Sequence, residues 1–435
     1  RPGAEPGAPW DVEVVDEASA PYRVQLGVAP DGRRVHRDLP EGGTVGEQVF
    51  VWDPAPDGWR RTPVEVDPTT VEWEIGTRQD ANAPTPKPLE GRGGNVFHKC
   101  LWFDPQHGEP GILTISGNLP YLKLWRRAGA EWRSEVLWTA EVGLDEHRLR
   151  DVEVGDVDGD GVDELVIATH NLGRVYVLEQ TPQGFVATAI SSTDYPYFVH
   201  EIELADVDGD GLPEIFATPS EPNRTDGGHQ KGEIVRFDFE GGSYVQRVVD
   251  APETRHAKEI LATDFFGDGR PVVFAALEGE GATAALGGGA AEGGSGTLIR
   301  MYRFDGAASA AEDVLPLPGE MCRFLNVGDT NGDGVRELIA STKADGVHAL
   351  WREGDAWRSR VLVPSYLSSG FEHATLVTDL DADGRDDLVL ASDDQKRLQW
   401  VRWDPERDRY PYEILHDFGD AIYFTWFVGV LPPGE

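Results

Sequence analysis

The chain has 435 residues, 40% of them hydrophobic, and a formal net charge of −38 at pH 7. This length allows two or three domains or one large repeat fold, and the apolar content suffices for a core. The charge argues against a nucleic-acid partner, because a polyanion would be repelled, and no apolar run approaches the ~18 residues of a membrane span.

The N-terminal region predicts a flexible end followed by separate strands. Residues 1–12 begin with a stretch rich in Pro, Gly and Ala, and we expect them to be flexible. Because the sequence starts at Arg1 without a methionine, we interpret this end as one left by leader removal or as an artificial boundary. Three strand candidates follow, at 22–27, 48–52 and 62–66.

An acidic loop recurs from residue 156 onward. Its intact copies begin at Asp156, Asp206, Asp329 and Asp379, and an eroded copy begins at Asp264. Successive first aspartates are 50, 58, 65 and 50 residues apart. This period is the size of one four-stranded propeller blade.

The intact loops have the residue pattern of calcium sites. Calcium takes six to eight oxygen ligands, which alternate positions of a tight loop can supply. Each loop offers oxygens at positions 1, 3, 5 and 9 and has glycine at position 6 for the turn. The predicted ligands are Asp156, Asp158, Asp160, Glu164, Asp206, Asp208, Asp210, Glu214, Asp329, Asn331, Asp333, Glu337, Asp379, Asp381, Asp383 and Asp387.

Short apolar runs after each loop indicate strands, so the predicted unit is a calcium-binding β-hairpin rather than a helix-loop-helix hand. The alternative is an Asp/Gly turn without metal. We favour that alternative for the copy at Asp264, because Phe266 and Val272 stand where ligands are needed. The cofactor expectation is therefore about four structural calcium ions.

The repeats predict an all-β fold, a seven-bladed β-propeller with four-stranded blades. Six blades are expected to start near residues 97, 148, 199, 257, 322 and 372. The seventh would take its outer strands from 13–90 and its inner strand from 422–430, so that both chain ends close the ring. The alternative is a separate small β domain over 1–90, followed by six blades.

These DxDxDG loops and the Leu/Ile/Val-Ala strands after them resemble FG-GAP/VCBS repeats, as in the propellers of integrin α-subunits and of many secreted bacterial proteins. The resemblance covers roughly residues 95–430. It implies calcium loops between first and second strands on one face, and ligand binding at the other face and central channel. It does not fix a function.

A basic or imidazole residue precedes each loop by six positions, near the start of each first strand. Because first strands line the channel, these residues would form a ring. With neighbouring groups, the candidate catalytic residues are His98, His147, Arg150, His200, His256, Lys258, Arg323, His373 and Tyr197. A solvated polar lining without function is the alternative.

Two functions fit such a ring. In the first, a carbohydrate lyase or dehydratase, Lys258 acts as base, Arg150 and Arg323 hold a carboxylate, and histidines bind one divalent transition metal. His-containing first strands such as the one at His200 give a short similarity to the propeller of fungal aldos-2-ulose dehydratase. In the second, the face binds a glycan or protein without chemistry, as in adhesion, and the long segments 219–233 and 277–297 support it.

The remaining expectations concern partners, location and thiols. We expect a small-molecule or oligosaccharide ligand, a monomer, and a secreted, periplasmic or cell-surface location, where calcium is plentiful. Cys100 and Cys322 lie in different repeats, so we predict two free buried thiols rather than a disulfide.

Overall fold

The computed structural model describes part of the chain. The described residues are 23–28, 48–55, 58–66, 71–75, 89–93, 96–117, 120–129, 131–140, 149–170, 173–191, 198–221, 230–279, 296–319, 321–370, 373–417 and 424–430. The expected flexible segment 1–12 and most of segment 277–297 lie outside them. Within this part, all regular structure is β, and no helix has the length and apolarity to cross a membrane.

Six antiparallel four-stranded sheets each consist of consecutive strands. The first three contain β6 (Val96–Phe103), β7 (Gly111–Gly117), β8 (Tyr121–Ala128) and β9 (Glu131–Thr139); β10 (Leu149–Gly155), β11 (Glu164–Thr169), β12 (Val175–Thr181) and β13 (Gly184–Ala189); and β14 (Phe198–Ala205), β15 (Glu214–Ser220), β16 (Ile234–Glu240) and β17 (Ser243–Asp250).

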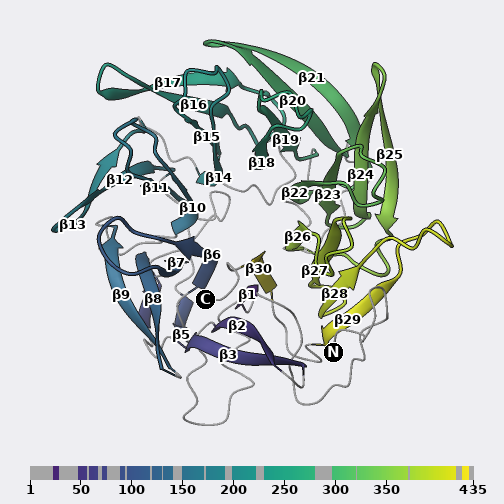
Figure 1. Cartoon of the computed structure of the whole chain (residues 1–435). Helices are drawn as coiled ribbons and strands as arrows, with labels where there is room; N and C mark the ends of the chain where they lie inside the picture. The colour runs from purple at the N-terminus through teal and green to yellow at the C-terminus, as the bar shows by residue number, and fades with distance from the viewer. Residues whose placement is uncertain are drawn as a thin grey trace.

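The other three follow in chain order. They contain β18 (Ala257–Thr263), β19 (Val272–Leu277), β20 (Thr297–Asp305) and β21 (Ala308–Leu317); β22 (Cys322–Gly328), β23 (Glu337–Thr342), β24 (Gly346–Glu353) and β25 (Ala356–Val363); and β26 (Thr375–Thr378), β27 (Asp387–Ser392), β28 (Arg397–Val401) and β29 (Tyr412–Asp417). We call these sheets blades 1 to 6, and Figure 1 shows them arranged as a ring.

The expectation of a seven-bladed propeller requires a correction. Six four-stranded antiparallel blades of consecutive strands are present, not seven. A further four-stranded sheet has the order β3-β2-β1-β30 and combines both chain ends, because β1 pairs with β2 and with β30. Its strands are β1 (Arg23–Val28), β2 (Gln48–Ala55), β3 (Gly58–Val66) and β30 (Phe424–Val430).

This composite sheet differs from the six blades in the parts of the chain that form it. Its sequence has no acidic loop, and its inner strand comes from the opposite end of the chain. Figure 1 places β30 near β6 and β26, so the sheet lies in the ring between blade 6 and blade 1. Pairing the chain ends there covers strand edges that would otherwise be open to other chains.

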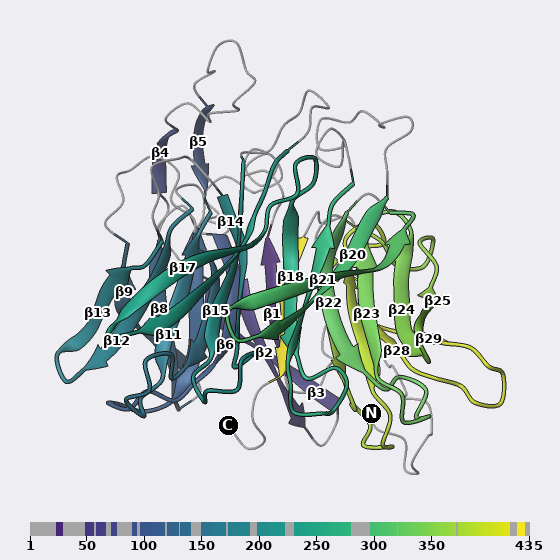
Figure 2. The same ribbon diagram turned by 90° about the horizontal axis from the view of Figure 1, so that it is seen from above.

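A separate pair of strands, β4 (Val71–Ile75) and β5 (Leu89–Gly93), forms a two-stranded sheet. Figure 2 shows this pair projecting to one side of the ring. The three N-terminal strand candidates correspond to β1, β2 and β3, whereas β4 and β5 were not expected from the sequence.

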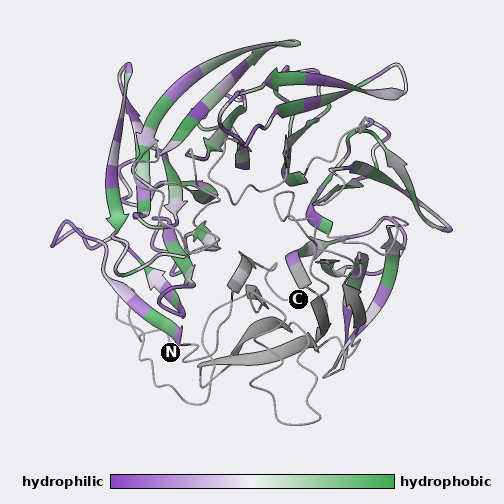
Figure 3. Ribbon diagram, turned by 180° about the vertical axis from the view of Figure 1, so that it is seen from behind, coloured by the Kyte–Doolittle hydropathy of each residue, from purple (hydrophilic) through white to green (hydrophobic). Residues whose placement is uncertain are grey.

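Burial decreases from the second strand of a blade to its fourth. Every residue of β11, β19, β23 and β27 is buried, because neighbouring blades cover both faces of these strands. The outer strand β13 consists of exposed and half-buried residues only. Figure 3 shows the corresponding mixture of hydrophilic and hydrophobic residues along the outer strands.

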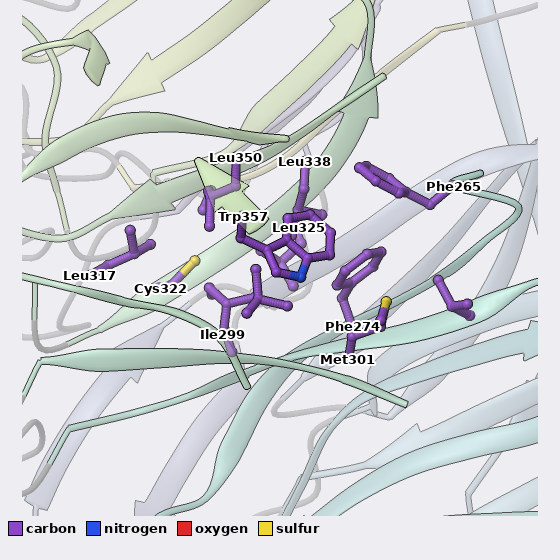
Figure 4. Packing of buried hydrophobic residues seen from close by; sticks show 14 residues of the cluster. Phe265, Phe274, Ile299, Met301, Leu317, Cys322, Leu325, Leu338, Leu350 and Trp357 are labelled. Atoms are coloured by element: carbon purple, nitrogen blue, oxygen red, sulfur yellow. The ribbon is translucent and has the colours of Figure 1, made fainter. Parts of the chain in front are cut away.

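The core consists of apolar clusters between neighbouring blades. The largest joins blades 4 and 5, where Trp357 from β25 lies against Phe274 from β19, with ring centroids 6.1 Å apart (Figure 4). A second cluster joins Val428 of β30 to blade 6. Cys100 and Cys322 are both free and buried, which confirms the thiol prediction, and burial raises the pKa of each thiol.

Candidate functional site

The acidic loops are held in shape by hydrogen bonds from their own backbone. In the first, Gly159 and Gly161 donate backbone N–H bonds to the two carboxylate oxygens of Asp156, at 2.8 and 3.0 Å. Val157 donates to Glu164 Oε2 at 3.0 Å. The bond from the glycine at position 6 recurs in the other three intact loops; for example, Gly211 donates to Asp206 Oδ2 at 3.0 Å. In the loop at Asp379, Asp383 rather than the residue at position 4 donates to Asp379 Oδ1. Carboxylate oxygens are thereby gathered before any ion binds.

Several of these loops present groups of carboxylates that could hold a metal ion. In each group, ligand atoms lie within 4.8 Å of one another. The groups are Asp156, Asp158 and Glu164; Asp206, Asp208 and Asp210; Asp208, Glu214 and Asp238; and Asp379, Asp381 and Asp383. The oxygen-only donor set fits a hard cation such as calcium.

Burial and mutual repulsion act on the acids at loop position 9. Burial raises the pKa of Glu164 to about 8, and Asp158, Asp160 and Asp156 act in the same direction. Burial likewise raises the pKa of Asp387 to about 7. These carboxylates therefore lack full compensation by protein cations, which is the electrostatic condition a metal ion would relieve.

The loops that begin at Asp329 and Asp264 differ from the three loops that present carboxylate groups. The loop at Asp329 keeps the turn bonds but has Asn331 at position 3, whose amide donates to Asp333 at 3.0 Å. The eroded loop keeps its turn, with Gly269 donating to Asp264 Oδ2 at 3.0 Å. Its third position holds Phe266, which packs on Phe265 with ring centroids 5.1 Å apart.

The basic ring coincides with irregularities in the inner strands. The pairing of the first and second strands shifts register at one point in each of blades 1 to 5. The residues at these bulges include His98, Arg150, His200, Lys258 and Arg323. A β-bulge leaves a residue unpaired and re-aims its side chain. Figure 1 shows these inner strands nearest the centre of the ring.

Glu278, which directly follows β19, is the centre of a buried ionic cluster. Its side chain is 0% exposed, with Oε2 3.0 Å from His256 Nε2 and 3.7 Å from Lys258 Nζ. Its Oε1 lies 3.2 Å from Arg323 Nε. Burial alone would raise the pKa of Glu278, but Arg323, Lys258 and His256 hold it well below its usual range.

His200 lies beside this cluster in a basic environment. It is 3% exposed, and neither ring nitrogen has a hydrogen-bond partner within the described part of the chain. Its ring meets that of His170 edge-on at 4.9 Å, and His170 stacks on Phe198 at 4.3 Å. Burial and then Lys258 lower the pKa of His200 well below its usual value, which keeps the imidazole neutral near pH 7.

Two other predicted histidines are engaged in structural bonds. His98 Nδ1 bonds to the carbonyl of Leu149 at 2.9 Å, which links blade 1 to blade 2. His373 is 1% exposed and bonds through Nε2 to Ser368 Oγ at 2.5 Å. Within the described residues, the groups that could hold a metal ion include no histidine, so a metal shared by His98, His200 and His373 gains no support.

Acidic side chains next to the ring join the inner strands of neighbouring blades. Asp151 accepts bonds from Lys99 Nζ and from the Ile202 backbone, both at 2.8 Å. Glu259 accepts a bond from the Leu325 backbone at 2.9 Å, and burial raises its pKa to about 8. Each acid therefore connects its own blade to an adjacent one.

The sequence reasoning identified part of this cluster. The sequence analysis did not select Lys99 or Glu278. Lys99 could have been found as the charged residue next to His98, and Glu278 as the charged residue that ends the apolar run 272–277. Arg150 lies 3.6 Å from Glu201, the residue after His200. Two predicted residues, His147 and Tyr197, lie outside the described residues.

Comparison with protein-family models identifies one part of the chain. Residues 156–217, from the first acidic loop to β15, match the FG-GAP-like repeat. This stretch is an FG-GAP-like repeat. The matched stretch contains two of the four intact acidic loops, the strands β11 to β14 and the first part of β15. A search of curated protein sequences finds no match.

Two solved structures are similar in fold. One is a lectin from Agrocybe aegerita described as recognising non-reducing terminal N-acetylglucosamine; it is 14% identical, with a TM-score of 0.54 and coverage of 92% of both chains. The other, a protein from Lactobacillus plantarum, is 8% identical, with a TM-score of 0.52 and coverage of 95% of this chain and 100% of that one. At such identity the likeness concerns the fold alone.

Proposed function

We propose that the protein is a calcium-binding propeller that binds a carbohydrate at the centre of its ring of blades. The observation that carries this proposal is the coincidence of five inner-strand bulges with five basic or imidazole residues. Bulges that re-aim polar side chains toward one place are typical of binding sites. Sugars offer many hydroxyl groups to such donors, and the stacked rings of His170 and Phe198 offer an apolar face nearby.

The likeness to a lectin agrees with this proposal but does not carry it. It gives the fold, and the named recognition of N-acetylglucosamine belongs to that protein. The acidic loops would bind calcium as structural ions, each linking two strands of one blade. A secreted, periplasmic or cell-surface location follows as a proposal from this calcium requirement, and a monomer is the proposed assembly.

A glycan microarray tests the proposal. We expect the calcium-loaded protein to bind a defined set of glycans, and His200→Ala to weaken binding at least tenfold. The matched control is His348→Ala, which removes a histidine of similar burial from β24, a third strand. Equal binding by wild type and His200→Ala, or binding to no glycan, would contradict a carbohydrate site at the ring.

A carbohydrate lyase is the second candidate, and the buried His256–Glu278 pair favours it. Burial lowers the pKa of His256 against the opposing effect of Glu278, so a neutral imidazole is available as base near pH 7. Lys258 suits that role less, because the carboxylate of Glu278 stabilises the ammonium form. Formation of an unsaturated sugar, followed by ultraviolet absorbance, would support this candidate, provided that His256→Ala abolishes it.

A further inference from the structure

We propose that the guanidinium of Arg236, on β16, takes the place of a metal cation at the acidic loop of blade 3, residues 206–214. This loop is therefore the weakest calcium site of the four intact loops. The inference rests on the proposal that these loops bind calcium. It concerns the difference between one loop and the other three.

The guanidinium of Arg236 lies among three carboxylates. Its Nη2 is 2.8 Å from Asp208 Oδ2, the loop's third position, and 3.4 Å from Glu214 Oε1, the ninth. Its Nε donates to Asp238 Oδ1 at 2.6 Å. Asp208, Glu214 and Asp238 are also one of the groups whose oxygens lie within 4.8 Å of one another. A protein cation already bridges the oxygens that a metal ion would otherwise bridge.

Arg236 is fixed in this place. It is 2% exposed, and its Nη1 donates to the carbonyl of Gly306 at 2.8 Å. Its guanidinium carbon lies 5.6 Å from the ring centre of Phe304. A buried charge held by several partners cannot move into water when an ion arrives, so its repulsion of that ion is weakly screened.

The strand register shows that this arginine is peculiar to blade 3. Arg236 on β16 pairs with Phe216, two residues after the acid at loop position 9. The three equivalent positions in the other blades with intact loops carry no charge: they are Val177, Ala349 and Trp400, paired with Val166, Ile339 and Val389. These blades therefore supply an internal comparison at one structural position.

The blade 3 loop otherwise matches the others. Gly209 donates to Asp206 Oδ1 at 2.7 Å, and Val207 donates to Glu214 Oε2 at 2.9 Å, as in the first loop. The loop conformation is thus independent of Arg236, and the difference between the loops is one of charge. In the described residues, no basic side chain forms an ion pair with the carboxylates of loop 156–164.

Arginines near the remaining two loops act more weakly. Arg360 lies 2.8 Å from Glu337, Arg402 lies 3.6 Å from Asp381, and Arg385 pairs with Asp383 of its own loop. Each contacts a single loop carboxylate, and the side chains of Arg360, Arg402 and Arg385 are 30%, 24% and 33% exposed, so water screens them. We therefore rank loop 156–164 as the tightest site and loop 206–214 as the weakest.

Calcium titration of the full chain, by calorimetry and equilibrium dialysis, tests this ranking. We expect a tighter class of sites and one weaker site in the wild type. Arg236→Met, which keeps the side-chain bulk but removes the charge, should tighten the weak site by about 10–100-fold. The control Arg360→Met should leave that site unchanged.

A second variant identifies the weak site without altering Arg236. Asp206→Asn should remove only the weak class, whereas Asp156→Asn should remove one tight site. If Arg236→Met weakens the weak site, the arginine supports calcium binding and the inference is wrong. Loss of a tight site in Asp206→Asn would overturn it equally. If no variant and no wild-type sample binds calcium, the proposed calcium function itself fails and this inference fails with it.

Discussion

Glu278 of blade 4 and Arg323 of blade 5 meet inside the ring, with Oε1 of the carboxylate 3.2 Å from Nε of the guanidinium. Both side chains are almost fully buried, at 0% and 5% exposed. Lys258 and His256 share the same carboxylate. One acid that sequence reasoning did not select therefore compensates three members of the predicted basic cluster and joins two blades.

Glu278→Gln should destabilise the protein strongly. The substitution leaves buried cations without their carboxylate, which typically costs about 3–5 kcal/mol. Urea unfolding at neutral pH measures the change in the free energy of unfolding. The control Glu353→Gln removes one member of a pair with Arg358 whose side chains are 67% and 55% exposed, and should change stability by less than about 0.5 kcal/mol. Equal effects of the two variants would refute the central role of Glu278.

The same cluster predicts sensitivity to acid. The pKa of Glu278 is lower in the folded protein than the ordinary 4.5, so the unfolded chain binds more protons as pH falls. Its contribution to stability is present above about pH 4.5 and declines below that value. We expect the urea midpoint of wild type to fall more steeply with acid than that of Glu278→Gln. Parallel pH profiles would show that Glu278 is not the source.

Calcium removal should lower thermal stability. A ligand that binds only the folded state at 100 times its dissociation constant adds about 2.7 kcal/mol per site. We expect a chelator of divalent ions to lower the melting temperature, and added calcium to restore it. Magnesium at the same concentration should restore less, because it requires stricter geometry and sheds its water reluctantly. An unchanged melting temperature would argue against structural calcium in these loops.

The intact and eroded loops should differ in calcium stoichiometry. Asp158→Ala removes an oxygen from a complete group, so elemental analysis of the dialysed protein should find one calcium ion fewer. Asp268→Ala removes the carboxylate at position 5 of the loop that has Phe266 at position 3, and the calcium content should stay constant. Loss of an ion in the second variant would show that the eroded loop binds calcium as well.

Ala382 is a site where the last loop is strained. It adopts a φ of 59°, whereas Gly159, Gly209 and Gly332 occupy the equivalent position with φ of 80°, 79° and 73°. Ala382→Gly relieves the strain of the left-handed backbone but raises the entropy of the unfolded chain. The net effect should be a stabilisation of about 0.5–1 kcal/mol. The reverse change Gly209→Ala, where no atom lies within 4 Å of an added Cβ, should cost about 0.5–1 kcal/mol for the same reason. Thermal melts of both variants with calcium present measure this, and a destabilised Ala382→Gly would contradict it.

Local patterns made much of the fold predictable. Asp and Gly at fixed loop positions gave the turns, because Asp156 accepts backbone bonds from the glycines that follow it. The apolar runs after each loop gave the second strands, because a strand covered on both faces contains little but apolar residues. Whether the composite sheet of β1–β3 and β30 counts as a further blade is harder to predict from sequence, because its strands come from opposite ends of the chain and carry no repeat motif.

The site was less predictable than the loops. Counting back from each loop selected His98, Arg150, His200, Lys258 and Arg323 because blades repeat. The same count selected His373, which instead bonds to Ser368 in a buried network. Sequence cannot distinguish these cases, because the partner of a side chain depends on which loop packs over it.

The sequence by itself determined the repeating hairpins, the carboxylates that form each loop, and the apolar strands that follow them, since these depend on residues close together in the chain. Only the tertiary structure decided which charges compensate one another. Glu278 meets Arg323 across 45 residues, and Arg236 meets Asp208 across 28, because neighbouring strands and blades pack side by side. Electrostatic interactions depend on distance in space, and a ring of blades brings together charges that the sequence separates.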